Sequence, residues 1–379
     1  MSRLDPRPAQ PAPAAFAGAS APDGPAAAGA GDRATRPGPA PAVPSIEFES
    51  VSFAYPDGTR ALEAVELRIE PGESVAIVGQ NGSGKSTLVR HLNGLLRPSA
   101  GRVLLGGRDV RGVHVARLAG VVGLAFQNPD RQLFAGRVSE EVAFGPRNLG
   151  VRGAELGKRV SAALAAVGLG AEAASNPYDL GYSRRKLLAL ASVLAMRTPI
   201  LVLDEPTTAQ DARGVALVRG AVAGAAREGR TVIAISHDMR FVAESFGRVV
   251  VMREGRVALD GAPDAVFAEG AWQELRAANL EPPLPALAGA RLGLGATPTA
   301  AGFVAALAAR ADEWILAVPP VPAADGRRQF EQWRSAHDPE HRLDDDDVRI
   351  DLICGRDGVS TTQFWVRGSA LRALSSGEE

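Results

Sequence analysis

The chain of 379 residues is short of several residue types, and each shortage excludes a class of protein. It holds one cysteine, Cys354, so a disulfide framework is excluded and a reducing compartment is expected. No apolar run approaches the roughly 20 residues of a membrane-spanning helix, so any membrane role should be peripheral, through a partner. The first residues lack the pattern of a signal peptide, and we expect none. The formal net charge of -1 gives no reason to expect nucleic acid as a partner.

Lysine is also scarce: among 42 basic residues only Lys85, Lys158 and Lys186 are lysines. Lys85 belongs to the run Gly79-Gln-Asn-Gly-Ser-Gly-Lys85-Ser86-Thr87, which has the form G-x-x-x-x-G-K-[ST] of a phosphate-binding loop. An apolar run at 74–78 predicts a strand before it, and residues 88–92 predict the opening of a helix after it. That context favours a working phosphate loop over a glycine-rich turn with an incidental lysine.

The residue types of this loop suit a nucleoside triphosphate. Glycines let backbone N–H groups converge on an anion, and a helix N-terminus adds partial positive charge. Lys85 would supply a point charge for the β- and γ-phosphates, and Ser86 a hydroxyl for Mg²⁺. We therefore predict a nucleoside triphosphate and Mg²⁺ as ligands of Gly79, Asn81, Gly82, Ser83, Gly84, Lys85, Ser86 and Thr87, and the family resemblance described below implies that the nucleotide is ATP.

The composition changes twice along the chain. Residues 1–44 are mostly Pro, Ala and Gly and are too poor in large apolar residues to bury a core, which predicts a disordered tail. Residues 45–281 have the pattern of a folded domain, in which apolar alternation over 46–69 predicts an antiparallel sheet and 137–197 a helical subdomain. Pro282-Pro283 breaks the pattern, so we place a boundary there and treat 282–379 as a separate C-terminal region.

Polar residues follow two further apolar runs that predict buried strands. The run at 200–203 ends in Asp204-Glu205, and the run at 231–235 ends in Ser236-His237. A third run, at 249–252, predicts a closing hairpin with 257–259. Ligands of open α/β sheets bind at the carboxyl ends of the strands. We predict that Asp204 holds Mg²⁺ and that Glu205 orients the attacking water, rather than that both acids merely cap a strand.

In this order and spacing, residues 46 to about 280 resemble the ATP-binding subunit of an ABC transporter. The resemblance implies a P-loop ABC ATPase core with an antiparallel β-subdomain and a helical subdomain, here followed by a small C-terminal α/β region. It also implies roles for single residues. Tyr55 would stack on adenine, Gln127 would touch Mg²⁺ and a transmembrane partner, Asp211 would lie at a dimer seam, and His237 would reach the γ-phosphate.

A narrower resemblance lies in Phe126-Gln-Asn-Pro-Asp-Arg-Gln-Leu-Phe134 and Val138-Ser-Glu-Glu-Val-Ala-Phe-Gly-Pro146. These segments resemble the ATPases of energy-coupling-factor importers, which take up vitamins, cobalt or nickel ions. The resemblance implies ATP hydrolysis that drives import of a metal ion or vitamin at the cytoplasmic face of the cell membrane. The partner would be a transmembrane coupling subunit, which contacts the segment after Gln127.

The chain departs from the family at the signature motif Leu-Ser-Gly-Gly-Gln, whose serine lies 23 residues before the Walker B aspartate. Counting back from Asp204 reaches Gly181, within Leu180-Gly-Tyr-Ser-Arg184. The family's serine is thus a glycine, and Tyr182 stands where a glycine is expected. A register that places the signature serine at Ser183 needs a two-residue deletion in the following helix, so we prefer the ungapped register.

In the family each ATP lies between one subunit's phosphate loop and the other subunit's signature. Tyr182 should crowd that approach, whereas Arg184 or Arg185 could supply compensating charge. We favour a heterodimer with unequal sites, completed by a second ATPase subunit. The alternative is a subgroup-specific signature that works normally, even in a homodimer.

Two other functions stay open. One is a soluble ABC ATPase of translation or DNA repair, although the chain has one phosphate loop and no sustained heptads. The other is a nucleotide-gated regulator with weak hydrolysis, which the altered signature favours and Glu205 and His237 oppose.

The C-terminal region offers little chemistry. The pattern predicts a helix at 299–310, strands at 313–318 and 348–353, and a helix at 327–336. The resemblance to importer ATPases, which often pair through C-terminal helices, implies a dimerisation role for the helix at 299–310. The acidic run 344–347, with His337, His341 and Cys354 nearby, is better explained as a solvated loop than as a metal site.

Overall fold

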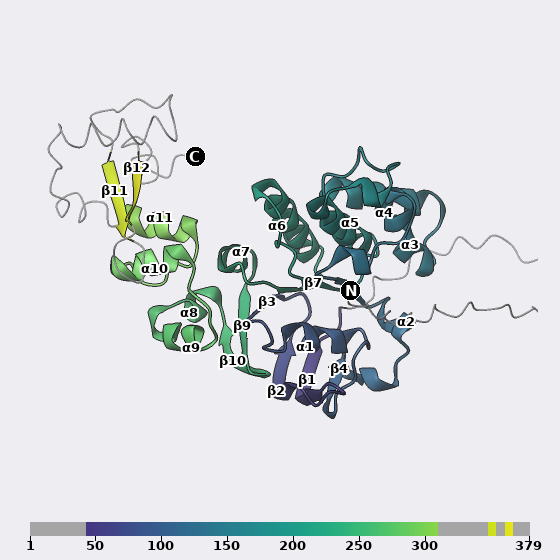
Figure 1. The fold of residues 1–379 in the computed structure, drawn as a ribbon, viewed down its shortest axis with the longest axis horizontal. Coiled ribbons are helices and arrows are strands. Elements are labelled where there is room, and N and C mark those ends of the chain that lie inside the picture. Colours follow the sequence, from purple (N-terminus) through teal and green to yellow (C-terminus); the bar gives the residue numbers. More distant parts are fainter. Residues whose placement is uncertain (1–42, 310–347, 354–360, 367–379) are drawn as a thin grey trace, which may run out of the picture. The chain divides into compact units, whose positions relative to one another are not determined.

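The computed structural model describes residues 43–309, 348–353 and 361–366. Its largest sheet has six strands in the order β10-β9-β3-β8-β7-β6. Figure 1 labels β10, β9, β3 and β7 of this sheet. The strands are β3 (Ser74–Val78), β6 (Val122–Ala125), β7 (Ile200–Asp204), β8 (Thr231–Ile235), β9 (Arg248–Arg253) and β10 (Arg256–Gly261). All neighbours in this sheet pair in parallel except β9 and β10, which form an antiparallel hairpin. The strands expected at 74–78, 200–203 and 231–235 and the closing hairpin are therefore confirmed.

A second sheet is antiparallel and has the order β2-β1-β4-β5. Its strands are β1 (Ile46–Ala54), β2 (Arg60–Ile69), β4 (Ala100–Leu105) and β5 (Arg108–Asp109). Phe48 of β1 lies opposite Leu67 of β2, and both side chains are buried. The alternation at 46–69 thus reflects a sheet with one buried face, as predicted.

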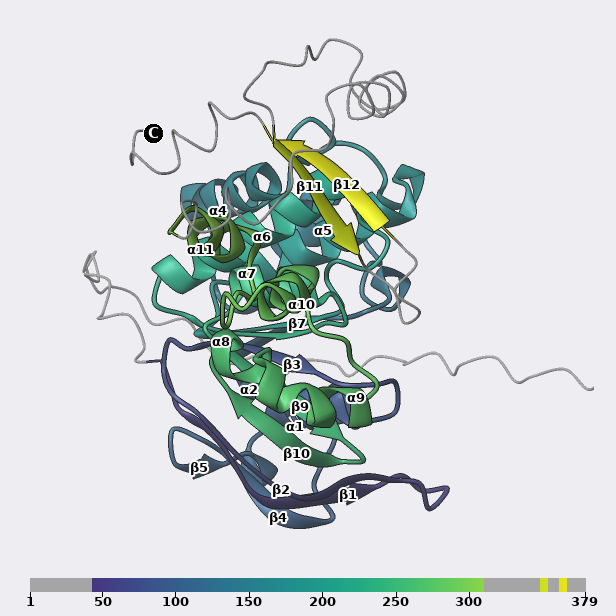
Figure 2. The ribbon, with the colours of Figure 1, turned by 90° about the vertical axis from the view of Figure 1, so that its left-hand side faces the viewer.

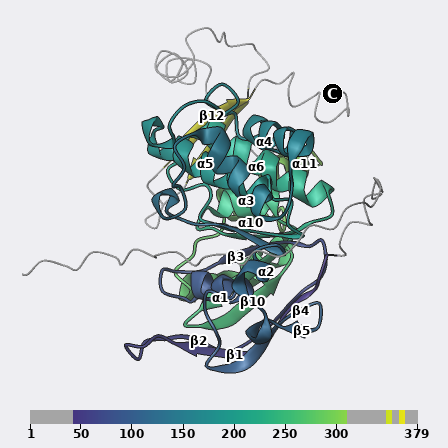
Figure 3. The same ribbon diagram turned by 90° about the vertical axis from the view of Figure 1, so that its right-hand side faces the viewer.

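Helices cover both faces of the six-stranded sheet. Alternate residues of a strand point to opposite faces: Ile200 and Val202 of β7 pack with one cluster of buried residues, Leu201 and Leu203 with the other. The first cluster includes α1 (Lys85–Leu92) and the inner face of the antiparallel sheet, so α1 lies between the two sheets (Figures 2 and 3).

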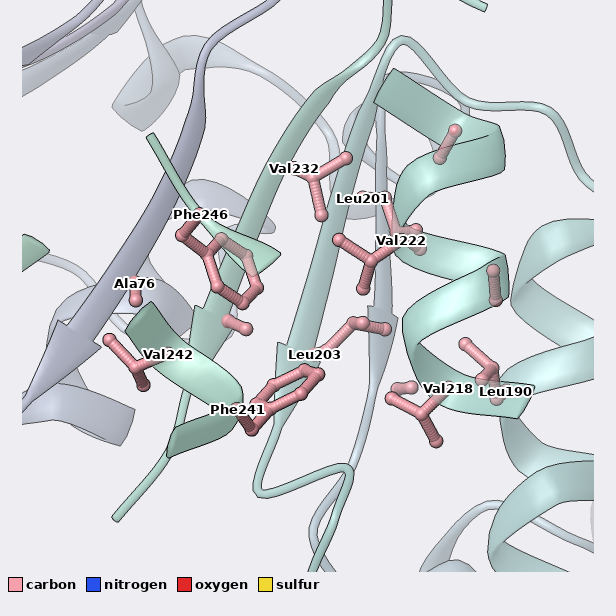
Figure 4. Close-up of a cluster of buried hydrophobic side chains, with 14 of the residues drawn as sticks. Ala76, Leu190, Leu201, Leu203, Val218, Val222, Val232, Phe241, Val242 and Phe246 are labelled. Carbon is pink, nitrogen blue, oxygen red and sulfur yellow. The ribbon is translucent and has the colours of Figure 1, made fainter. Parts of the chain in front are cut away.

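The second cluster joins the sheet to helices on its other face. Figure 4 shows Leu203 of β7 and Val232 of β8 near Val218 and Val222 of α6 (Ala212–Arg227) and Phe241 of α7 (Met239–Ser245). Burying a side chain of this size stabilises the fold by about 1.5–3 kcal/mol. Both faces of the parallel strands are therefore covered by buried apolar side chains, and the polar residues of interest lie at the strand ends.

The stretch expected to be helical holds α3 (Val138–Asn148), α4 (Gly153–Ala166) and α5 (Tyr182–Leu194). The remaining short elements are α2 (Val115–Leu118), α8 (Pro263–Val266), α9 (Trp272–Ala277) and the 3₁₀ turns Val110–Gly112, Pro129–Arg131, Pro177–Asp179 and Glu269–Ala271. The predicted α/β fold class, with its antiparallel and helical parts, is confirmed. No helix among the described residues has the length and apolarity to cross a bilayer.

Beyond Pro283 the structure describes α10 (Leu284–Arg291), α11 (Ala300–Ala309) and an antiparallel hairpin of β11 (Val348–Ile353) and β12 (Thr361–Val366). The expected helix at 299–310 coincides with α11, and the expected strand at 348–353 with β11. Outside the described residues lie most of the expected tail at 1–44, the strand at 313–318, the helix at 327–336, and the acidic run with His337, His341 and Cys354.

Candidate functional site

The loop between β3 and α1 is shaped by Gly84, which has φ 99° and caps the N-terminus of the helix. A Cβ atom at this position would lie 2.4 Å from the carbonyl oxygen of Ala61, so only glycine fits. The helix begins at Lys85, three residues earlier than the sequence indicated, and its hydrogen bonds start with Leu88 N–H to the Gly84 carbonyl at 2.8 Å. The N–H groups of residues 85–87 therefore precede the helical ladder, as in an anion-binding helix N-terminus.

Lys85 is buried within this loop. Its Nζ donates to the carbonyl oxygens of Gly79 at 2.7 Å and Gln80 at 2.8 Å. Burial lowers the pKa of Lys85, and the carboxylates of Glu205 and Asp204 oppose that change. The ammonium thus lies where the loop and two strand-end acids converge.

The other predicted loop residues differ in exposure. Asn81 and Gly82 are exposed at the tip of the loop, while Ser83 is buried. The Ser83 hydroxyl lies 3.5 Å from Lys85 Nζ. Asn81 and Gly82 therefore face solvent, whereas Ser83 faces Lys85.

Ser86 and Asp204 meet although they are 118 positions apart in the chain. The Ser86 hydroxyl donates to Asp204 Oδ1 at 3.2 Å, because β3 and β7 both pair with β8 and end at the same edge of the sheet. Burial raises the pKa of Asp204, and the Ser86 hydrogen bond opposes the rise. A hydroxyl and a carboxylate are the hard oxygen donors that Mg²⁺ prefers, and a bound cation would favour the charged carboxylate. These two residues therefore fit a magnesium ion.

Glu205 and His237 form the next pair along the same edge. His237 Nδ1 lies 2.7 Å from Glu205 Oε2, and the Thr208 hydroxyl donates to the same oxygen at 3.2 Å. Asp204 pairs with Ile235 across β7 and β8, so the residues that follow each strand are neighbours. The Glu205 side chain is 9 % exposed and that of His237 64 %, so the carboxylate is sheltered while the imidazole reaches solvent. A sheltered carboxylate with an orienting partner is suited to holding a water molecule.

Tyr55 contacts the first turn of α1 rather than standing free. Its hydroxyl lies 2.9 Å from the Thr87 hydroxyl, and the Phe53 ring packs edge-on against the tyrosine ring at 5.0 Å. Phe53 also packs against His91, whose Nδ1 donates to the Thr87 carbonyl at 2.7 Å. Sequence reasoning missed His91, which is fully buried; its spacing of four from Thr87 on one helical face was the available signal.

Among the described residues, no hydrogen bond or ion pair joins Gln127 or Asp211 to Lys85, Asp204 or Glu205. Gln127 is exposed, two residues beyond Ala125, which pairs with Leu203 in the sheet. Asp211 is the N-cap of α6, where its Oδ1 accepts from the Gly214 N–H at 2.7 Å. The structure therefore gives Asp211 a local capping role beside the one that the resemblance implies.

The altered signature lies at the start of α5. Gly181 is the N-cap, and Tyr182 is the first helical residue, with 41 % of its surface exposed. The Ser183 hydroxyl donates to Gln210 Oε1 at 2.8 Å, so it is already engaged within the chain.

The two arginines that follow are also engaged. Arg184 pairs with Glu172, and Arg185 Nε lies 3.3 Å from Asp130 Oδ1. Both contacts are with acids of the same chain, which counts against the expectation that either arginine is free to compensate for the lost signature.

Two further residues near the site, besides His91, were missed by sequence reasoning. Lys186 is buried, and Gln210 exchanges hydrogen bonds with Ser183. The scarcity of lysine was the one available signal for Lys186. Gln210 carries no sequence signal of its own, since its partner is set by the packing of α5.

Comparisons with known proteins bear on the family and the fold of the chain. A family model described as "ABC transporter" matches residues 62–208. An energy-coupling factor transporter ATP-binding protein, EcfA2 of Symbiobacterium thermophilum, is 46% identical over 245 residues, which are 63% of this chain and 84% of that protein. A solved structure of cbiO1 from Clostridium perfringens, described as part of the ABC transporter complex cbiONQ, has a TM-score of 0.55 at 36% identity. That likeness covers 62% of this chain and 95% of the other.

Some relatives are much longer than the matched region. A putative ABC transporter ATP-binding protein of Methanosarcina acetivorans is 43% identical over 254 residues, 66% of this chain, but the chain spans only 41% of that protein. The range matched by the family model includes the phosphate loop, Asp204 and Glu205. The chain belongs to the ABC transporter ATP-binding proteins and resembles the ATP-binding subunits of energy-coupling factor transporters.

Proposed function

We propose that this protein hydrolyses ATP to energise the import of a small solute, a metal ion or a vitamin, through a membrane-embedded partner. The observation that carries the proposal is the convergence of Lys85, the Ser86–Asp204 pair and the Glu205–His237 pair at one sheet edge. The printed names of the relatives, energy-coupling factor transporter and cbiONQ complex, support the importer class.

The residues divide the work of hydrolysis by their positions. Lys85 and the N–H groups at the start of α1 bind the β- and γ-phosphates, and Tyr55 provides the aromatic surface for adenine. Ser86 and Asp204, aided by Gln127, would hold Mg²⁺, which would supply positive charge beside the phosphate oxygens.

Glu205 has the role of positioning the water molecule that hydrolyses ATP. Its carboxylate orients a water molecule for in-line attack on the γ-phosphorus, and His237 faces the transferred group. The 2.7 Å contact between the two side chains supports their acting together.

An exposed aromatic surface lies in the segment after Gln127 and supports a transmembrane coupling subunit as the partner. Phe134 and Phe144 are 58 % and 46 % exposed and pack edge-on at 4.7 Å. Tyr178 is 53 % exposed and donates its hydroxyl hydrogen to the Leu133 carbonyl at 3.0 Å. Clustered exposed aromatic rings are typical of interaction surfaces. Docking here would place the chain peripherally at the cytoplasmic face of the membrane.

A second ATPase subunit is part of the proposal, and a heterodimer is favoured over a homodimer. The Ser183 hydroxyl is engaged by Gln210, Arg184 and Arg185 pair with acids, and Tyr182 projects at the helix start. In this arrangement the chain's own phosphate loop is completed by a partner's regular signature, while the opposite site turns over slowly. A nucleotide-gated regulator remains the second candidate, supported by the same features.

The test is the ATPase rate of the full chain beside Glu205→Gln, alone and with its membrane partners. We expect the variant to lose about 10²-fold or more in rate, as for a residue that positions and polarises water. Glu254→Gln is the matched control, because Glu254 shares the positive φ of Glu205, 50° against 53°, but lies in the exposed turn between β9 and β10.

The outcomes separate the candidates. Strong activity of the chain alone would exclude the unequal-site heterodimer, whereas activity that appears on adding a second ATPase would support it. An unchanged rate in Glu205→Gln would refute the assignment of Glu205. No hydrolysis in any combination would favour the regulator.

A further inference from the structure

The first turns of α5 are tied to the segment that follows β7 by a buried lysine. Lys186 is 7 % exposed, and its Nζ donates to the Glu205 carbonyl at 2.5 Å and to the Thr208 carbonyl at 3.1 Å. An ammonium has three donors and no acceptor, so one side chain can hold two carbonyl groups at once. Lys186 thereby connects a helix of the signature region to the backbone of a proposed catalytic residue.

The backbone held by Lys186 is in an unusual conformation. Glu205 has φ 53°, a left-handed conformation that a residue with a side chain adopts only when its surroundings enforce it. The Glu205 N–H donates to the Ile235 carbonyl at 2.9 Å, so β8 holds one side of the residue and Lys186 the other. These two contacts hold the Glu205 backbone, from which the carboxylate extends to His237 and Thr208.

A second contact repeats the connection one turn away. The Ser183 hydroxyl donates to Gln210 Oε1 at 2.8 Å, and Gln210 Nε2 donates back to the Ser183 carbonyl at 3.0 Å. Between Thr208 and Gln210 lies Ala209, another non-glycine residue with positive φ, at 60°. The segment 205–210 thus holds two left-handed residues, and α5 binds it on both sides of the second.

A charged lysine at this buried position should lower the stability of the fold, because its ammonium group is removed from water. Burial lowers the pKa of Lys186, and only the carboxylates of Glu205 and Asp204 oppose that change. A buried charge is expensive unless it is paired or fully hydrogen-bonded. Of the three lysines in the sequence, Lys85 and Lys186 are both buried beside this pair of carboxylates.

We propose that Lys186 is a positioning residue for ATP hydrolysis, which fixes the Glu205 carboxylate against His237 by holding the carbonyls of Glu205 and Thr208. The Ser183–Gln210 contact is the second part of the same clamp. The inference rests on the proposed role of Glu205 and adds a residue of the same chain that positions Glu205.

The test compares Lys186→Met with Lys186→Gln in the full chain, assayed in the assembly that gives the highest ATPase rate. Methionine keeps the apolar stem and removes every donor, while glutamine keeps a neutral donor. We expect kcat to fall about 10- to 100-fold in Lys186→Met, the scale of a catalytic group misplaced by about 1 Å, and less in Lys186→Gln. The affinity for ATP, measured by titration without Mg²⁺, should stay within about threefold, because Lys85 and the loop are unchanged.

A control and a double variant make the result specific. Lys158→Met removes the exposed third lysine, on α4, and should change neither kcat nor affinity. In the Glu205→Gln background, Lys186→Met should lower the residual rate no further, because the residue acts through Glu205. Should Lys186→Met fail to fold, Lys186→Gln and Gln210→Ala supply the same comparison.

Three results would overturn the inference: a normal kcat in Lys186→Met, an ATP affinity that falls as far as kcat, or an additional loss in the Glu205→Gln background. Failure of the proposed function is distinguishable. If Glu205→Gln keeps a normal rate, the role of Glu205 is wrong; if it is inactive while both Lys186 variants are normal, only the role of Lys186 is wrong.

Discussion

Two glycines of the phosphate loop should respond very differently to the same substitution. Gly84 and Gly82 both have positive φ, 99° and 83°. A Cβ on Gly84 would lie 2.4 Å from the Ala61 carbonyl oxygen and 2.9 Å from Leu62 Cδ2, whereas a Cβ on Gly82 would meet nothing within 4 Å. Comparing the two substitutions therefore separates the free-energy cost of the left-handed backbone conformation from the cost of steric contact with neighbouring atoms.

The magnitudes follow from this geometry. An L-residue in the left-handed region costs about 1–2 kcal/mol, which Gly82→Ala and Gly84→Ala both incur. Gly84→Ala adds an overpacking cost of about 1–3 kcal/mol, since the atom it meets belongs to the backbone of β2 and cannot rotate away. We expect losses in the free energy of unfolding of about 1–2 kcal/mol for Gly82→Ala and about 2–5 kcal/mol for Gly84→Ala.

Urea unfolding of both variants, without nucleotide, measures these losses. ATP binding is the second readout, and Gly84→Ala should weaken it at least tenfold, because the clash moves the first N–H groups of α1 away from the phosphates. Equal losses in the two variants, or a Gly84→Ala protein that binds ATP normally, would refute the argument from close approach.

Three further predictions concern other parts of the protein. Asp204→Asn should stabilise the nucleotide-free protein at pH 7, because burial raises the pKa of Asp204 and makes its charged form costly. The gain should vanish as pH falls below the usual carboxyl range, where Asp204 is protonated in both the folded and the unfolded state. Thermal unfolding of both proteins from pH 2 to 8 measures the gain, and a gain that persists at the lowest pH would contradict the reasoning. Arg248→Met should cost about 1–2 kcal/mol in urea unfolding, less in high salt, since the guanidinium makes two 2.7 Å bonds to Asp260 but is partly solvated; no loss would contradict this. Phe134→Ser with Phe144→Ser should weaken partner binding at least tenfold in a titration, at an unchanged ATPase rate of the chain alone; unchanged binding would exclude that surface.

Much of the fold was predictable because its signals are local. An apolar run followed by a glycine-rich loop specifies a strand and a turn within about fifteen residues, so β3 and the loop before α1 were placed correctly. Alternation over 46–69 identified the antiparallel sheet for the same reason. The start of α1 was misplaced because Lys85, Ser86 and Thr87 carry no apolar pattern, although they form its first turn.

Sequence alone therefore determined which residue types are available for nucleotide chemistry and on which strand ends they lie. The tertiary structure decided which of them meet. The strand order β3-β8-β7 brings Ser86 to Asp204 and Glu205 to His237, and no local pattern encodes that order. The packing of α5 against the end of β7 decided the contacts of Lys186, because a side chain's partners across a domain depend on how the whole core closes.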